Sequence, residues 1–190
     1  QKIYFRHGIV YETSSGLKRY LLKTIDRISG SLADKVVCVS NDVKRISEKD
    51  KLNNYKKNIV LGLGTCNGVD CYNKFNPFLI DNVSKESLKN DLGINDNDFV
   101  VGFLGRLVND KGIPELLAAW RILLTQNHNI KMLLVGPFES KDGISTENKQ
   151  YIQNEDSIIH TGLIDNSAPY LNCMDLLVLP TYREGFPTVV

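Results

Sequence analysis

Hydrophobic residues in this chain alternate between short continuous runs and runs with helical spacing. In the first third, apolar runs at residues 2–5, 35–40 and 57–62 are typical of buried strands, whereas residues 16–33 and 41–49 have helical periodicity. Strands that alternate with helices in this way predict a parallel sheet. We therefore expect the first part of the chain to form an α/β domain.

A second series of strands and helices follows the first. Its apolar runs consist almost entirely of Val, Ile and Leu, which indicates a parallel sheet that is buried on both faces. Trp120 lies on the apolar side of a helix in this series, so we expect it in the core. The segment 139–156 is polar, and we expect it to be exposed. The predicted strands are residues 98–105, 130–136, 157–162 and 176–180, and the predicted helices are residues 112–127 and 167–174.

The composition changes between the two series. Gly, Asn, Asp and a Pro are frequent from residue 62 to residue 98, which is typical of an interdomain connection. We place this connection at residues 69–98, between one domain at residues 1–68 and another at residues 99–190. The predicted fold class is α/β, with two Rossmann-like, doubly wound parallel sheets.

Charge and cysteine content narrow the classes of function. The net charge is +1, so no dense basic surface is available for binding many phosphates of a nucleic acid. The four cysteines, Cys38, Cys66, Cys71 and Cys173, lack CxxC spacing and are interpreted as reduced and not metal-binding. No apolar run is long enough to span a membrane. These features predict a cytoplasmic protein.

Two cations follow the first strand of the second series. In "VVGFLGRLVNDKG", the strand ends at Gly105, Arg106 occupies the turn and Lys111 precedes a helix. Both side chains can face the carboxyl edge of the sheet, where charge-assisted hydrogen bonds to a diphosphate would contribute about 1.5–3 kcal/mol each. The alternative is a pair of solvated charges around a turn, and the spacing alone does not decide between the two.

Glu184 is a candidate because of its position after the last apolar run. Gly185 and Pro187 mark a turn there, which puts the carboxylate at the edge where open α/β sheets bind ligands. His7 follows the first strand, and on its own a histidine in that position is more often structural than catalytic. Asp175, just before the last strand, is expected to be a turn carboxylate.

Five segments carry a resemblance to a known family. In chain order they are "NGVD", "GFLGRLVNDKGIPELLAAW", "MLLVG", "IIHTGLI" and "YLNCMDLLVLPTYREGFPTVV". Together they resemble the retaining glycosyltransferases of family 4, which have the GT-B fold of two facing Rossmann-like domains. "IYFRHG" and "ADKVVCVSND" are similar to the bacterial capsule and exopolysaccharide transferases of that family. The resemblance implies an acceptor-side domain at residues 1–68 and a nucleotide-sugar donor domain at residues 99–190, both incomplete.

The resemblance also implies roles for individual residues. Arg106 and Lys111 match the pair that binds the donor's diphosphate, and Glu184 matches the acid that contacts the donor sugar. His7 matches a histidine that reaches toward the transferred sugar, which gives a catalytic set of four. The remaining donor-binding positions, with main-chain contacts expected at the last three, are Gly105, Ile164, Gly185 and Phe186.

The implied activity is transfer of a sugar from a nucleotide donor, UDP-linked, to a saccharide or lipid-linked acceptor in polysaccharide biosynthesis. No Asp-x-Asp pair stands on a loop after a strand, so we expect no metal and no cofactor. The family's second acid would fall beyond Val190 and its glycine-rich loop before Gln1, so we expect a fragment that is itself inactive. The alternative is a non-catalytic nucleotide-sugar-binding module. A dinucleotide oxidoreductase would need GxGxxG, which is absent.

The helix predicted at residues 16–33 allows two interpretations. Its apolar side can pack on a sheet, which is the commoner arrangement, or a basic amphipathic helix can lie on anionic lipid. A lipid-linked acceptor would favour peripheral contact at the inner face of the membrane. The apolar side carries Leu17, Tyr20, Leu21, Thr24, Ile25 and Ile28, and the basic residues are Lys18, Arg19, Lys23 and Arg27.

Overall fold

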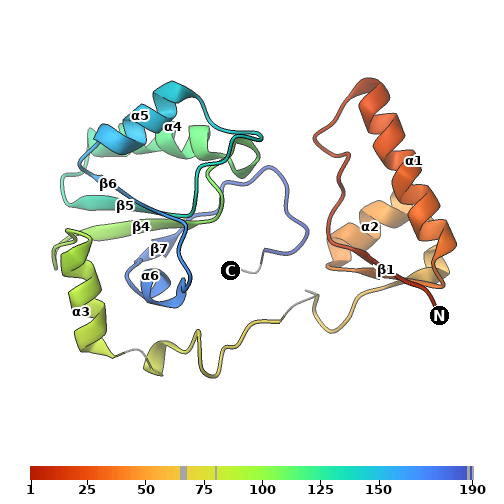
Figure 1. Ribbon diagram of the computed structural model, residues 1–190, viewed down its shortest axis with the longest axis horizontal. Helices are drawn as coiled ribbons and strands as arrows, with labels where there is room; N and C mark the ends of the chain where they lie inside the picture. Colours follow the sequence, from red (N-terminus) through yellow and green to blue (C-terminus); the bar gives the residue numbers. More distant parts are fainter. Residues whose placement is uncertain (65–67, 80, 188, 190) are drawn as a thin grey trace. The chain divides into compact units, whose positions relative to one another are not determined.

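A computed structural model describes residues 1–64, 68–79, 81–187 and 189 of the chain. Cys66 lies outside these residues. The contacts divide the chain into two units (Figure 1): the first comprises residues 1–69 and 183–190, and the second comprises residues 70–182. No helix within the described part of the chain is long and apolar enough to cross a membrane.

The first unit contains a three-stranded parallel sheet in the order β1-β2-β3. The third strand is shorter than predicted, and the chain turns at Gly62, which has a φ of 56°. A cap on the second helix comes from the side chain of Ser40, which accepts a hydrogen bond from the amide of Val43. The elements are β1 (Ile3–Arg6), α1 (Gly16–Leu32), β2 (Lys35–Cys38), α2 (Asn41–Lys49), the 3-10 helix η1 (Tyr55–Lys57) and β3 (Asn58–Ile59).

Helix α1 packs against the rest of the first unit through its polar side. Asp26 and Gly30 are its buried residues, whereas Leu17, Ile25 and Ile28 are 73%, 60% and 55% exposed. The expectation that the apolar side of this helix packs on the sheet is therefore wrong. Periodicity could not reveal this inversion, because the inward side is selected by a charged residue of β1.

That residue is Arg6, which is 1% exposed. Its Nε and Nη2 donate hydrogen bonds of 3.2 and 2.9 Å to Oδ1 of Asp26, and its Nη1 donates to the side chains of Ser47 and Asn53. A buried guanidinium requires a counter-charge and satisfied hydrogen bonds, and these partners supply both. A Cβ atom at Gly30 would lie 2.9 Å from Nη2 of Arg6, so the glycine leaves room for the cation.

The second unit is a four-stranded parallel sheet in the order β6-β5-β4-β7. Figure 1 shows α4 and α5 on one face of this sheet and α3 and α6 on the other. The elements are η2 (Pro77–Leu79), α3 (Asn82–Asp91), β4 (Phe99–Leu104), η3 (Asn109–Lys111), α4 (Ile113–Leu124), β5 (Ile130–Val135), α5 (Thr146–Asn154), β6 (Ile158–Gly162), α6 (Ala168–Asn172) and β7 (Leu176–Leu177).

The central strand β4 is buried on both faces, as the sequence predicts. Phe103 belongs to the core cluster under α4, whereas Val100 belongs to the cluster that α3 and α6 cover. Trp120 is 1% exposed in the first cluster, and its Nε1 donates a 3.0 Å hydrogen bond to Oγ of Ser157. Asp175 accepts a 2.8 Å hydrogen bond from the amide of Val100, so its carboxylate bonds the backbone of β4 and not the turn that the sequence predicts.

Residues 139–156 differ from the exposed polar segment that the sequence predicts. They contain α5, which is capped where Ser145 accepts a hydrogen bond from the amide of Asn148. Ile144 and Ile152 are buried in the core cluster under α4. Two anchoring residues are too few to give a clear period, which is why the sequence pattern misses this helix.

The Arg6–Asp26 pair generates a prediction about stability. Replacing Asp26 by Ala should destabilise the first unit by about 3–5 kcal/mol, because it leaves a buried guanidinium without its counter-charge. Hydrogen exchange of the β2 amides, Val36 to Cys38, measures this loss. Asp42→Ala is the control, since the Asp42–Arg45 pair is exposed and contributes at most about 1 kcal/mol. Equal losses in the two variants would contradict the prediction.

Candidate functional site

The strand order of the second sheet marks one point of its edge as the candidate ligand site. From β4 the chain moves outward through β5 and β6, and then returns to place β7 on the other side of β4. Ligands of open α/β sheets bind at such a reversal, outside the carboxyl ends of the strands. The loops at this reversal are residues 105–112 after β4 and residues 178–182 after β7.

The loop after β4 carries both predicted cations. Leu107 and Val108 are 0% and 1% exposed and anchor the loop in the core, while the side chain of Arg106 is 56% exposed. Lys111 is half-buried at the end of η3. The sequence thus predicts correctly that this loop brings both residues to the carboxyl edge of the sheet.

A second loop, after β5, fixes the backbone around these cations. The amide of Leu107 donates to the carbonyl of Pro137, and the amide of Asn109 donates to the carbonyl of Asp142, both at 2.9 Å. The carboxylate of Asp142 accepts a 2.8 Å hydrogen bond from the amide of Asp110. The loop 136–143 therefore holds the loop 105–112 along its length.

The loop after β7 closes on the same backbone. The carbonyl of Asp110 accepts hydrogen bonds from the amide of Tyr182 at 3.0 Å and from the hydroxyl of Thr181 at 3.2 Å. The hydroxyl of Tyr182 donates a 2.6 Å hydrogen bond to Glu115, and this bond raises the pKa of Tyr182. The loop after β4 is thus joined by hydrogen bonds to both the loop after β5 and the loop after β7.

Arg106 has a carboxylate partner that the sequence reading did not select. Its Nη1 donates a 3.0 Å hydrogen bond to Oε2 of Glu139, and the two form an ion pair. Glu139 lies in the loop after β5, distant from Arg106 in sequence. Its only sequence signal is its place just after a predicted strand.

Gly105 and Ile164 also lie at this edge. The amide of Gly105 donates a 2.9 Å hydrogen bond to the carbonyl of Val135, which continues the pairing of β4 with β5. Ile164 follows the end of β6, and its side chain packs on the core cluster of α3 and α6. Packing of the side chain leaves the main chain as the part of Ile164 that can serve a ligand.

The remaining predicted residues belong to the first unit. His7 is exposed directly after β1, with its ring centroid 6.3 Å from that of Phe5. The backbone of Gly185 lies against the carbonyl of His7, so closely that a Cβ atom there would overlap it. Phe186 packs on Gly64, after β3. The segment from Glu184 to Phe186 therefore lies at the carboxyl ends of the first sheet, next to His7.

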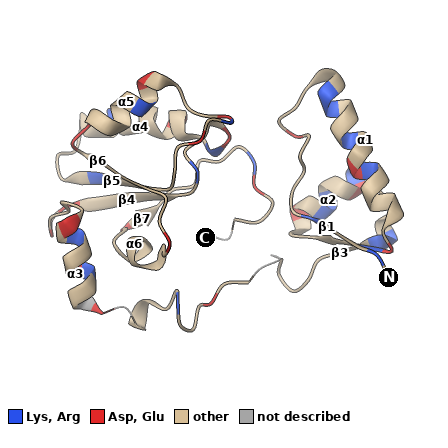
Figure 2. Ribbon diagram, in the orientation of Figure 1, with Lys and Arg blue, Asp and Glu red and all other residues tan. Residues whose placement is uncertain are grey.

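The site residues thus form one group in each unit. Arg106, Lys111 and Gly105 share the loop after β4 in the second unit, while His7 and Glu184 belong to the first. Convergence of the two groups on one ligand stays a prediction of the sequence. Figure 2 shows Lys and Arg residues distributed over both units without a single dense stripe.

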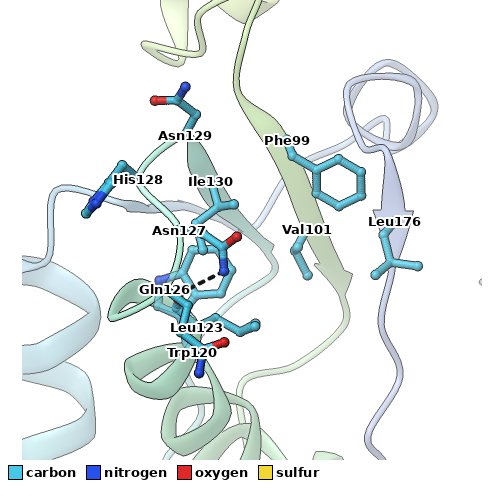
Figure 3. Close-up of a pocket in the computed structure, with 10 residues that line it drawn as sticks. All are labelled: Phe99, Val101, Trp120, Leu123, Gln126, Asn127, His128, Asn129, Ile130 and Leu176. Atoms are coloured by element: carbon cyan, nitrogen blue, oxygen red, sulfur yellow. Dashed lines mark hydrogen bonds between the residues drawn. The ribbon is translucent and has the colours of Figure 1, made fainter.

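An open pocket of about 640 Å³ lies elsewhere in the second unit (Figure 3). Phe99, Ile130 and Leu176, the first residues of β4, β5 and β7, line it together with Trp120 of α4. It therefore lies at the amino edge of the sheet, opposite the loop that holds Arg106. It is not the predicted donor site.

Similarity to known proteins agrees with the fold. The family described as "Glycosyl transferases group 1" matches residues 84–190. The chain belongs to this family.

Individual relatives extend the similarity to the whole chain. The capsular polysaccharide biosynthesis glycosyltransferase CapM of Staphylococcus aureus is 31% identical over 188 residues, which are 99% of this chain and 48% of CapM. The structure of Anabaena HepE in complex with UDP and glucose superposes with a TM-score of 0.78 at 21% identity, over 99% of this chain and 48% of HepE. WaaG, a glycosyltransferase involved in lipopolysaccharide biosynthesis, gives 0.75 at 15% identity, over 97% of this chain and 51% of WaaG. The predicted GT-B fold class is confirmed, and the chain spans about half the length of these relatives.

The close approach of the loops after β4 and β7 can be tested at a glycine. Gly112 has a φ of 70°, and a Cβ atom there would overlap the carbonyl of Pro180. Gly112→Ala should therefore cost more than the roughly 1–2 kcal/mol of a left-handed residue alone. Gly93→Ala is the matched control, because Gly93 has a φ of 67° and nothing within 4 Å of an added Cβ. Urea unfolding measures the stability of both variants, and equal unfolding midpoints would contradict the proximity of these loops.

Proposed function

We propose that the protein carrying this chain is a retaining glycosyltransferase of family 4. It moves a sugar from a UDP-linked donor to a saccharide or lipid-linked acceptor in polysaccharide biosynthesis, in the cytoplasm. The observation that carries the proposal is the placement of Arg106 and Lys111 on one loop at the strand reversal of the second sheet. Hydrogen bonds to the loops after β5 and β7 hold this loop in place. The family membership and the printed function of CapM in capsular polysaccharide biosynthesis support it.

The proposed chemistry assigns the cations to the leaving group. Cleavage of the bond between sugar and diphosphate develops negative charge on the departing oxygen, which Arg106 and Lys111 stabilise. No metal is required, because the two side chains supply the positive charge. UDP is the proposed nucleotide, supported by the HepE structures with UDP and with UDP-glucose.

The first unit is proposed to act on the sugar. Glu184 hydrogen-bonds the sugar hydroxyls and fixes the ring, with the amides of Gly185 and Phe186 beside it. His7, next to Gly185, faces the transferred sugar. Correct positioning of the reacting groups can lower the barrier by several kcal/mol. Glu184 is therefore a positioning residue and not a covalent nucleophile.

Single substitutions test this assignment in the protein expressed at its natural length. Arg106→Ala and Lys111→Ala should each weaken UDP binding and slow sugar transfer by about 100-fold, because each removes a charge on the leaving group. Transfer from radiolabelled UDP-sugars in the presence of EDTA measures both the effect and the metal independence.

Asp175→Asn is the control for this experiment, because Asp175 bonds the backbone of β4 and should affect mainly stability. Similar mild losses in all three variants would overturn the assignment. UDP binding without transfer or hydrolysis of any UDP-sugar would instead indicate a non-catalytic nucleotide-sugar-binding module.

We also propose that α1 contacts an anionic membrane surface. Its apolar side, including Leu17, Leu21 and Ile25, is exposed in the first unit. Lys18 is exposed on the same helix, and Figure 2 shows basic residues along it. Such a helix can bury its apolar side at the lipid interface while its cations contact lipid headgroups.

Sedimentation with phosphatidylglycerol vesicles tests the membrane contact. Leu21→Asp should abolish co-sedimentation, because it places a charge in the apolar side of α1. Val83→Asp is the control, since Val83 is an exposed apolar residue of α3. Lys18→Glu should weaken binding to these vesicles. Lys18 is chosen because Arg19 and Lys23 contact the ring of Tyr11, so substitutions there would also disturb packing within the first unit. Unchanged sedimentation of the Leu21 variant would show that this side does not bind lipid.

A further inference from the structure

Glu139 forms an ion pair with Arg106, one of the two cations proposed to bind the donor's diphosphate. The contact is a single 3.0 Å hydrogen bond from Nη1 of Arg106 to Oε2 of Glu139. Within the described part of the chain, the side chain of Arg106 hydrogen-bonds through Nη1 alone, and a guanidinium has five N–H donors in a planar fork. The carboxylate therefore binds one side of the guanidinium and leaves further donors available to another anion.

The position of Glu139 is set by its backbone and by its neighbours. Phe138, the preceding residue, forms a parallel bridge with Leu107, which follows Arg106. The ring of Phe138 lies 4.4 Å from that of His160, and Nε2 of His160 is 2.8 Å from the carbonyl of Gly136. These contacts hold the loop after β5 beside the loop after β4, so Glu139 meets Arg106 without a rearrangement of either backbone.

Stability of the fold does not explain this ion pair. The side chains of Arg106 and Glu139 are 56% and 33% exposed. Exposed pairs of this kind contribute little to folding, because water and salt screen them. The backbone hydrogen bonds of Leu107, Asn109 and Asp110 already join the two loops.

We propose that Glu139 is an internal counter-ion of the donor site, which competes with the donor's diphosphate for Arg106. This inference rests on the proposed function of Arg106. Through this ion pair, the Glu139 carboxylate neutralises and orients the guanidinium. A bound diphosphate places a second anion on the same guanidinium, so the Glu139 charge opposes it and lowers the affinity for donor and for released UDP. Glu139 is thus a positioning residue that sets affinity.

Titration calorimetry with UDP tests this in the protein at its natural length. Glu139→Gln keeps a side-chain oxygen that can accept the hydrogen bond from Arg106 but removes the charge. It should tighten UDP binding by about fivefold at about 20 mM NaCl, and by less at about 300 mM NaCl. The same substitution in an Arg106→Ala background should give a clearly smaller gain, because the competition for the guanidinium is gone.

Glu86→Gln is the control, because it removes the same charge from an exposed residue of α3. Figure 1 shows α3 on the face of the sheet opposite α4 and α5. This variant should leave the affinity for UDP unchanged, and circular dichroism checks that each variant is folded. Weaker or unchanged binding of UDP by Glu139→Gln, with Arg106→Ala still impaired, would overturn this inference alone. Failure of the unaltered protein to bind UDP would overturn the proposed function itself.

Discussion

Close backbone contact among three loops is the constraint on which the second unit's site depends. The loops after β4, β5 and β7 exchange main-chain hydrogen bonds around Asp110 and Leu107. Glycines permit this approach, since a Cβ atom at Gly136 would overlap the carbonyl of Gly105 and one at Gly112 would overlap that of Pro180. These contacts fix the backbone beneath Arg106, and charge held on a fixed backbone is preorganised in the way that stabilises charge developing in a transition state.

In the first unit, the candidate site residues are positioned by a buried cation and its hydrogen bonds. Its sheet carries a buried cation, Arg6, directly before the exposed His7. The partners of Arg6 come from α1, α2 and the loop before β3, so one side chain joins most elements of the unit. The glycine at position 185 then lets the chain lie against the carbonyl of His7. A rigid strand end and a close glycine contact together place the residues proposed to hold the sugar.

Sequence periodicity predicts most of these elements because most are packed by apolar residues. The strands of the second sheet and the buried side of α4 follow directly from their Val, Ile and Leu runs. Helix α1 does not follow that rule, because Asp26 turns inward to neutralise Arg6, and a hydrophobic pattern contains no information about charge pairing. The cations of the site are predictable as residues that follow a strand. Glu139 is not, because its contact with Arg106 depends on how two loops pair, which local sequence does not specify.

The placement of Trp120 has a practical consequence for spectroscopy. It is the single tryptophan of the chain, and it is buried under α4 with its indole N–H bonded to Ser157. Intrinsic emission excited at the red edge of the protein absorption band therefore reports on the second unit, whereas the first unit contributes only tyrosine. The unfolding of the second unit can therefore be followed selectively, without any added dye or label.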